Sequence, residues 1–183
     1  MTDFMVNEFL KSKRLSMRAL ERNDLTKIQE WLSDEDFTRL LFQGDIPKNI
    51  EKIKHDFLDN IDPKKDIIFG IVDQSNDELI GWAGIYEINW LSRNGELRFF
   101  IGKKKLWNKG FATDAVLLLI QYGFDKLNLH RLHGGANLEN YGSVKVFRKL
   151  GFSEEGISKD GFFRNGRYYD LIHFGLINPN EIT

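Results

Sequence analysis

The sequence predicts a single α/β (α+β) domain spanning residues 1–183. Three observations lead to this prediction. The length is that of one domain with one sizeable core. Apolar residues make up 42% of the chain and charged residues 29%, which is typical of globular proteins. Segments typical of strands and helices follow one another as strand, two helices, three strands, helix, strand, helix and two strands.

The first part of the chain predicts a strand and two helices. A strand is expected from Leu15, and the first helix begins at Asn23 or Asp24, either of which can cap a helix, and continues to Leu32. The second helix covers residues 49–60, where apolar residues recur near helical spacing between two prolines. We interpret these two helices as lids.

The remaining elements alternate between strands and helices. Runs rich in Ile, Val, Phe and aromatic residues predict strands over 67–73, 78–88 and 96–102. An apolar face at helical spacing predicts a helix over 110–126, followed by a strand over 131–136. A helix then begins at Asn140 and is ended by Gly151, and two strands close the chain over 152–161 and 167–176.

A short basic loop, residues 105–113, joins a strand to a long helix. A helix N-terminus presents unpaired backbone N–H groups and partial positive charge to an anion. Gly110 and Ala112 would let a phosphate approach the backbone, and four lysines add charge, namely Lys103, Lys104, Lys105 and Lys109. Neither a P-loop nor a G-x-G-x-x-G pattern is present. The loop therefore predicts a polyphosphate ligand outside those two classes.

The same loop resembles the acetyl-CoA pyrophosphate loop of the GCN5-related N-acetyltransferases, whose pattern is [Arg/Gln]-x-x-Gly-x-[Gly/Ala]. Lys105 takes the Arg/Gln place, Asn108 the first glycine place and Gly110 the second. Lysine keeps the charge of arginine but not its planar fork. Asparagine tolerates a left-handed backbone better than most residues, so it can replace glycine there.

The helix that begins at Asn140 extends this resemblance. Residues 140–152 resemble the family's Asn-x-x-Ser/Ala helix that ends in Lys-x-Gly-Phe. Residues 128–132, 154–156 and 162–168 are similar to the branch containing ribosomal-protein-alanine and spermidine N-acetyltransferases. In all, the resemblance covers about residues 12–177. It implies an acyl-CoA N-acyltransferase fold with about four helices and a mixed, largely antiparallel seven-stranded sheet, splayed between strands 96–102 and 131–136.

The resemblance implies acetyl-CoA as cosubstrate and a set of residues around it. Pantetheine is expected in the splay, where backbone N–H groups near Phe100 and Ile101 polarise the thioester carbonyl. The remaining cofactor-binding residues are expected to be Lys105, Asn108, Lys109, Gly110, Phe111, Ala112, Thr113, Asn140, Ser143 and Phe147. Asn140 can also simply cap its helix.

Proton transfer needs other groups. Glu96, at the start of a strand lining the cleft, is the expected general base, although a surface carboxylate is the alternative. Many family members protonate the leaving thiolate with a tyrosine in the place of Phe147, which has no proton to give. Ser143 is a replacement, unless it only caps its helix. Tyr141 is a further candidate, with a lid or surface role as its alternative.

The expected activity is acetyl transfer from CoA to a primary amine, by direct attack in a ternary complex. The acceptor can be a protein N-terminus, a polyamine or an amino sugar. A polyamine would suit the acidic residues of the two lid helices, Glu30, Asp34, Glu35, Asp36, Asp56 and Asp59, which solubility explains equally well. Phe147 favours the alternative of a non-catalytic acyl-CoA-binding sensor. A homodimer is a further option.

Composition limits other functions. A net charge of −1 gives no general attraction to nucleic acid or an anionic membrane. The absence of cysteine excludes disulfides, thiolate metal sites and a cysteine nucleophile. Four histidines at scattered spacings predict no metal site. The polar N-terminus and the lack of a long apolar run predict no membrane span and a cytoplasmic location.

Overall fold

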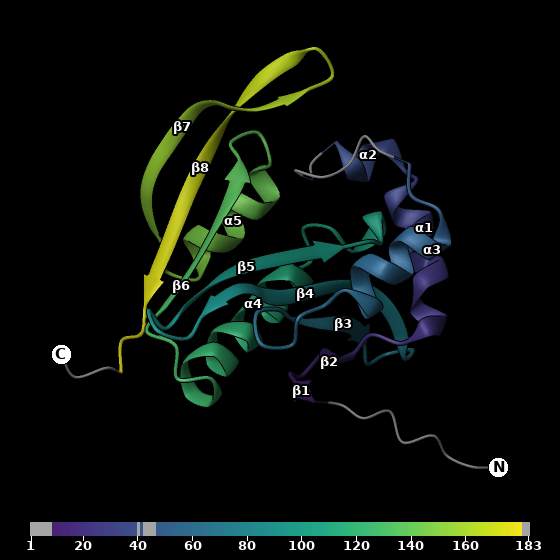
Figure 1. Cartoon of the computed structure of the whole chain (residues 1–183), viewed down its shortest axis with the longest axis horizontal. Coiled ribbons are helices and arrows are strands. Elements are labelled where there is room, and N and C mark those ends of the chain that lie inside the picture. Colours follow the sequence, from purple (N-terminus) through teal and green to yellow (C-terminus); the bar gives the residue numbers. More distant parts are fainter. Residues whose placement is uncertain (1–8, 40, 42–46, 181–183) are drawn as a thin grey trace.

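An eight-stranded mixed sheet runs through the computed structural model, which describes residues 9–39, 41 and 47–180. The spatial order is β1-β2-β3-β4-β5-β6-β8-β7 (Figure 1). The strands are β1 Leu10–Lys11, β2 Leu15–Ala19, β3 Ile67–Asp73, β4 Glu78–Asn89, β5 Asn94–Ile101, β6 Arg131–Asn137, β7 Ser153–Arg164 and β8 Arg167–Ile177. Neighbouring strands are antiparallel except β5 and β6, which are parallel. The predicted mixed, largely antiparallel sheet is confirmed.

The sheet has one strand more than the seven predicted. The additional strand is β1, whose two residues pair with Met17 and Ser16 of β2. Two residues are too short to carry a periodic pattern, so this strand could not be recognised in the sequence.

The described helices are α1 Leu25–Leu32, α2 Glu35–Thr38, α3 Ile50–Lys54, α4 Phe111–Gln121 and α5 Tyr141–Lys149. The four-residue α2 was not expected. Its N-cap, Asp34, accepts a hydrogen bond from the backbone N–H of Asp36 (2.9 Å). Helices α3 and α4 continue as π-helical turns over His55–Asp59 and Tyr122–Lys126. These extensions agree with the predicted ranges 49–60 and 110–126. None of the described helices is long and apolar enough to cross a membrane.

The entry into α1 differs from the expected cap. A 3₁₀ turn, Arg22–Asp24, precedes α1, so the chain turns helical earlier than predicted. The buried carboxylate of Asp24 accepts hydrogen bonds from the backbone N–H of Glu21 (2.8 Å) and from the Arg18 guanidinium (2.7 and 2.9 Å). Asp24 therefore ties the turn to β2.

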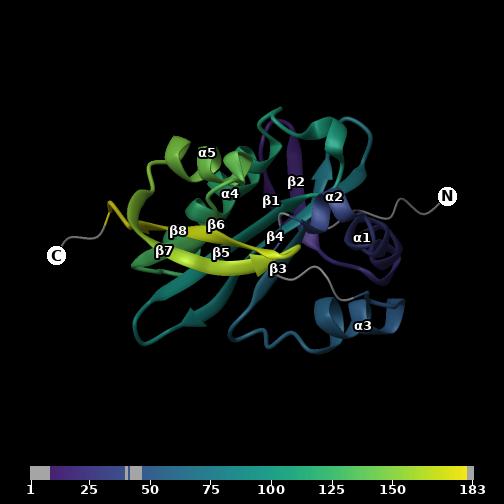
Figure 2. The same cartoon turned by 90° about the horizontal axis from the view of Figure 1, so that it is seen from above.

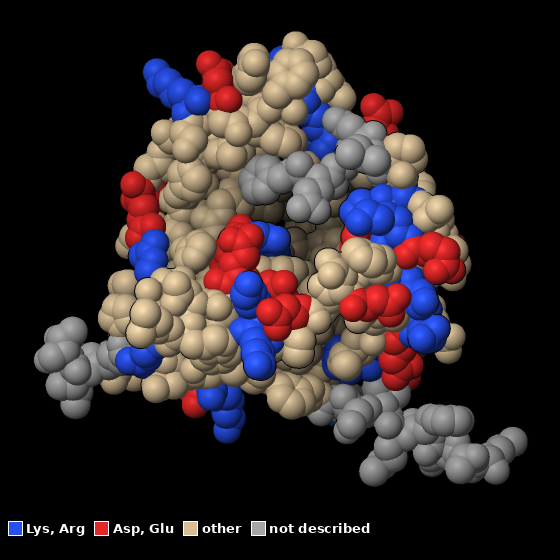
Figure 3. All heavy atoms as spheres, viewed as in Figure 1, with Lys and Arg blue, Asp and Glu red and all other residues tan. Residues whose placement is uncertain are grey.

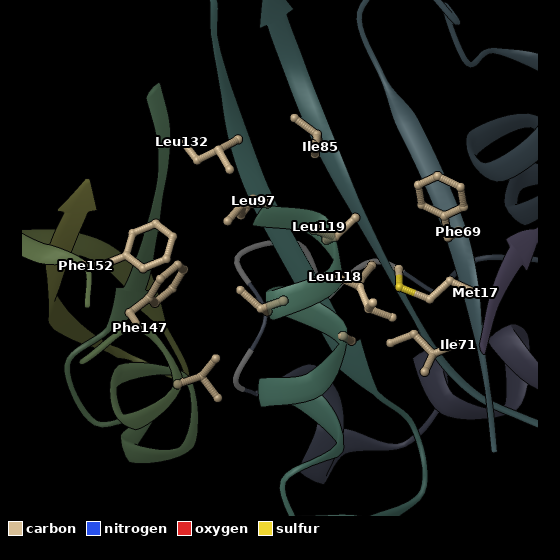
Figure 4. Close-up of a cluster of buried hydrophobic side chains, with 14 of the residues drawn as sticks. Met17, Phe69, Ile71, Ile85, Leu97, Leu118, Leu119, Leu132, Phe147 and Phe152 are labelled. Atoms are coloured by element: carbon tan, nitrogen blue, oxygen red, sulfur yellow. The ribbon is translucent and has the colours of Figure 1, made fainter. Parts of the chain in front are cut away.

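Helices cover both faces of the sheet (Figure 2). Helices α4 and α5 lie on one face over an aliphatic and aromatic core that includes Ile71, Leu119 and Leu132 (Figure 4). Helices α1 to α3 lie on the other face over an aromatic cluster, in which the rings of Trp82 and Phe100 stack at 4.3 Å. Burial of these two apolar surfaces stabilises the sheet from both sides.

The two central strands separate, as predicted. The parallel pairing of β5 and β6 joins Asn94–Glu96 to Arg131–His133, and no further pairs between them occur among the described residues. From Leu97 and Gly134 onward the two strands diverge. The carboxyl ends of β5 and β6 therefore leave an opening in the middle of the sheet.

Candidate active site

A cavity of about 900 Å³ lies at the open ends of β5 and β6. It is lined by the end of β5, the loop that follows it, the first turns of α4 and α5, and the tip of the β7–β8 hairpin. Figure 3 shows this face of the molecule hollowed near its centre, with acidic and basic side chains interspersed around the hollow. A cavity of this size suits a large cosubstrate together with part of a second substrate.

The loop before α4 has the conformation that the sequence led us to expect. Asn108 has a φ of +58°, so the asparagine in the glycine place adopts the left-handed backbone. Gly110, the N-cap of α4, has a φ of +87°. The indole Nε1 of Trp107 donates to the carbonyl of Ile101 (2.8 Å) and ties the loop to β5. The N-terminus of α4 consequently faces the cavity.

The four lysines in and just before the basic loop differ in whether they line the cavity. Lys109 lines the cavity, together with the predicted residues Asn108, Gly110, Phe111, Ala112 and Thr113. Lys103 forms an ion pair with Glu78, and Lys104 pairs with Asp34 (3.0 Å) and Asp36 (2.6 Å). Lys105 belongs to a 3₁₀ turn outside the cavity lining. Of these lysines, only Lys109 is placed to contribute charge to the cavity.

Basic residues that were not predicted as site residues also line the cavity. Lys145 and Lys149 of α5 line the cavity, as does Arg14 just before β2. Lys145 and Lys149 are four residues apart, so helical spacing places them on one face and could have identified them. Arg14 lies far from the loop in sequence, and no local pattern connects them.

The first turn of α5 brings three predicted residues to the cavity. Asn140 accepts a hydrogen bond at Oδ1 from the backbone N–H of Ser143 (3.1 Å), so it caps the helix. Ser143 and Tyr141 line the cavity beside it, and Tyr141 is 77% exposed at the rim. Gly151, with a φ of +83°, ends the helix as expected.

Phe147 lies elsewhere. Its side chain is 1% exposed and stacks on Phe174 (4.8 Å between ring centroids). The ring of Phe152 approaches it edge-on at 5.0 Å (Figure 4). The ring of Phe99 also approaches edge-on, at 5.5 Å. Phe147 does not line the cavity. Phe147 is a core residue beneath the site, because it lies on the apolar face of α5 that packs against the sheet.

Glu96 lies at the vertex of the splay, outside the cavity lining. Its Oε2 accepts a hydrogen bond from Nε of Arg98 (2.9 Å), and Arg98 also donates to Glu87 (2.7 Å). Phe100 follows Glu96 by four positions along β5, a distance of about 13 Å. Glu96 is therefore too far from the end of β5 for its carboxylate to contact a group bound there.

His133 on β6 lies opposite Glu96 on β5 in the parallel strand register, at the vertex of the splay. Burial lowers the pKa of His133 below its ordinary value, while the nearby Glu96 carboxylate opposes that shift. The net shift favours the neutral form of the imidazole.

Four of the six acidic residues expected on the lid helices form ion pairs with lysines, namely Asp34, Asp36, Asp56 and Asp59. Asp34 and Asp36 pair with Lys104, as described above. Asp56 accepts hydrogen bonds from Lys48 (2.8 Å) and Lys52 (2.7 Å). Partial burial raises the pKa of Asp56, but the hydrogen bonds from these lysines outweigh burial and lower it to about 2. A cationic acceptor that used these carboxylates would have to displace lysine side chains.

Comparison with known proteins identifies the family. A family model described as an acetyltransferase (GNAT) domain matches residues 14–153. The spermidine N(1)-acetyltransferase of Escherichia coli is 32% identical over 170 residues, covering 92% of this chain and 89% of that protein. The putative ribosomal N-acetyltransferase YdaF of Bacillus subtilis is 25% identical over 170 residues, covering 91% and 92%.

Solved structures agree with this match. The spermidine N-acetyltransferase of Vibrio cholerae, in complex with CoA and spermine, has a TM-score of 0.83 and 28% identity, covering 91% of this chain and 97% of that one. A dodecameric structure of the same Vibrio enzyme has a TM-score of 0.76 and 29% identity, covering 91% and 95%. The chain therefore belongs to the GNAT acetyltransferase family and is an acetyl-CoA-dependent N-acetyltransferase.

Proposed function

We propose that this enzyme acetylates a polyamine, by direct attack of a primary amine on acetyl-CoA in a ternary complex. The observation that carries the proposal is the continuous cavity, which joins the N-terminus of α4 to the opening between β5 and β6. CoA fits with its diphosphate at residues 108–113 and its pantetheine in the opening. The polyamine class rests on the spermidine acetyltransferases of Escherichia coli and Vibrio cholerae.

The end of β5 supplies the group that polarises the thioester carbonyl. The N–H of Gly102 donates to the carbonyl of Ile80 on β4 (2.7 Å). Because N–H groups alternate sides along a strand, the N–H of Phe100 also faces β4, and that of Ile101 faces the opening. Of the two residues expected from the sequence, Ile101 is therefore the proposed oxyanion donor.

Ser143 and Glu96 are the proposed proton-transfer groups, with Ser143 near the thiolate and Glu96 acting through water. Ser143→Ala should lower kcat at least about tenfold and leave CoA affinity unchanged. The substitution preserves the helix cap, because Ser143 contributes its backbone N–H to Asn140. Glu96→Gln should likewise reduce kcat alone. Steady-state kinetics with calorimetric CoA titration measures both effects.

Full turnover in both variants would contradict these assignments and leave proton transfer to solvent or to another residue. Tyr141 and His133 are the next residues to test in that case. Tyr141→Phe keeps the ring at the rim and removes only its hydroxyl.

The acceptor class is tested by comparing kcat/KM for spermidine, spermine, a peptide with a free N-terminus, an aminoglycoside and a nucleotide-linked amino sugar. We expect the highest value for a polyamine, with an acetylated polyamine as the product identified by mass. A higher value for the peptide would replace the polyamine with a protein N-terminus as acceptor.

Self-association through β7 is proposed on separate grounds. This twelve-residue strand lies at one edge of the sheet, so among the described residues no strand pairs with one side of its backbone. Ile157 and Phe163 on β7 are 54% and 58% exposed, and Tyr168 on β8 is 62% exposed. Long exposed edges of this kind favour pairing with another chain. Light scattering of the purified protein measures the state of association.

A further inference from the structure

We propose that Arg14 is a positioning residue for the CoA diphosphate, acting through the loop that precedes α4. Arg14 lies 95 positions before Lys109 in the sequence, and both line the same cavity. The proposal rests on the proposed place of the diphosphate at residues 108–113. It adds a residue from the N-terminal part of the chain to that site.

The Arg14 guanidinium holds the loop on both sides of Gly110. Its Nη1 donates to the carbonyl of Lys109 (2.9 Å). Its Nε and Nη2 both donate to Oδ2 of Asp114 in the first turn of α4 (3.0 and 2.7 Å). The guanidinium carbon also lies 4.9 Å from the ring centroid of Phe111. One side chain therefore fixes the loop and the start of the helix together.

The ion pair between Arg14 and Asp114 affects the charge at the start of α4. The Asp114 carboxylate lies in the first turn of α4, where it interacts favourably with the partial positive charge of the helix N-terminus. The same carboxylate would repel a diphosphate bound at that helix end. Because Arg14 is paired with Asp114, the two charges cancel locally, and the helix end and Lys109 keep their attraction for an anion.

The hydrogen bond from Arg14 to the Lys109 carbonyl also affects the orientation of the peptide between residues 109 and 110. Asn108 and Gly110 both have positive φ, and glycine populates several backbone conformations readily, so the peptide between residues 109 and 110 is not fixed by local sterics. In a planar trans peptide the carbonyl and the N–H point in opposite directions. The bond from Arg14 to the Lys109 carbonyl therefore turns the N–H of Gly110 away from Arg14. This donor is oriented before the ligand arrives.

Comparison of two acyl donors tests the proposal. S-acetylpantetheine carries the same thioester as acetyl-CoA but lacks the diphosphate. In Arg14→Ala we expect KM for acetyl-CoA to rise roughly tenfold and kcat/KM for S-acetylpantetheine to stay unchanged. Arg14→Lys should fall between Arg14→Ala and the unmodified enzyme, because it keeps the charge but loses the fork. If Arg14→Ala does not fold, Arg14→Lys supports the same comparison.

Adding Asp114→Asn to Arg14→Ala should recover part of the loss, because the repelling carboxylate is removed. Lys13→Ala is the matched control, since it removes an exposed positive charge one residue away, outside the cavity lining. Equal losses with both donors, or no loss with acetyl-CoA, would overturn the proposal. Absence of any recovery in the double variant would overturn the charge argument.

CoA binding by Gly110→Asp and by Arg14→Ala together distinguishes a wrong role for Arg14 from a wrong place for the diphosphate. If Gly110→Asp abolishes CoA binding while Arg14→Ala has no effect, the site stands and the role of Arg14 is wrong. If neither substitution affects CoA binding, the diphosphate does not lie at this loop.

Discussion

Gly110→Asp should weaken CoA binding by roughly 100-fold or more while the protein remains folded. Gly110 is the N-cap of α4, and its position lies where the diphosphate is proposed to approach the backbone. The substitution introduces a negative charge there, together with a Cβ atom 3.0 Å from Nη2 of Arg14. Calorimetric titration with CoA measures the loss directly.

Gly151→Asp is the control for backbone strain. Gly151 has a φ of +83°, close to the +87° of Gly110, and a Cβ added there would meet nothing within 4 Å. This variant should therefore lose stability through the left-handed backbone but retain its affinity for CoA. Unchanged CoA affinity in folded Gly110→Asp would show that the diphosphate binds elsewhere.

Phe147→Ala should lower the free energy of unfolding by about 3–5 kcal/mol. The ring is 1% exposed and packs against Phe99, Phe152 and Phe174, so its removal leaves a cavity in the core. A Cβ added at Gly134 would lie 2.6 Å from Cζ of Phe147, which shows how tightly the ring fits against β6. Urea unfolding followed by circular dichroism measures the change.

Leu91→Ala is the control because its side chain is 95% exposed and lies outside β7. We expect its unfolding free energy to change by less than about 1 kcal/mol. Similar losses in the two variants would contradict the assignment of Phe147 to the core. A folded Phe147→Ala with normal stability and weakened CoA binding would instead support the contact with CoA that the family resemblance implied.

The fold could be predicted because strand and helix periodicities were strong and continuous. The ranges 67–73 and 131–136 coincide with β3 and nearly with β6. The loop conformation could also be anticipated, because Asn108 and Gly110 are the residue types that tolerate positive φ. These are local properties, and the sequence displays them directly.

Other features depend on contacts between distant segments. The pairing of Arg14 with Asp114 spans 100 positions, and that of Lys104 with Asp34 spans 70.

The choice of partner for a charged side chain was also not evident from the sequence. Glu96 was identified from its position on a strand, but Arg98, two residues away on the same strand face, donates a hydrogen bond to it. Spacing alone cannot show which of several charged neighbours a side chain will choose, because that choice depends on the tertiary packing around it.

Amine-dependent release of free CoA thiol from acetyl-CoA tests the central claim most directly. With spermidine as the acceptor, we expect thiol release well above the rate of hydrolysis without amine, and far less release in Gly110→Asp at the same acetyl-CoA concentration. Tight CoA binding without amine-stimulated release, for spermidine and for every other acceptor class tested, would contradict the claim. The chain would then act as an acyl-CoA-binding sensor built on the same fold.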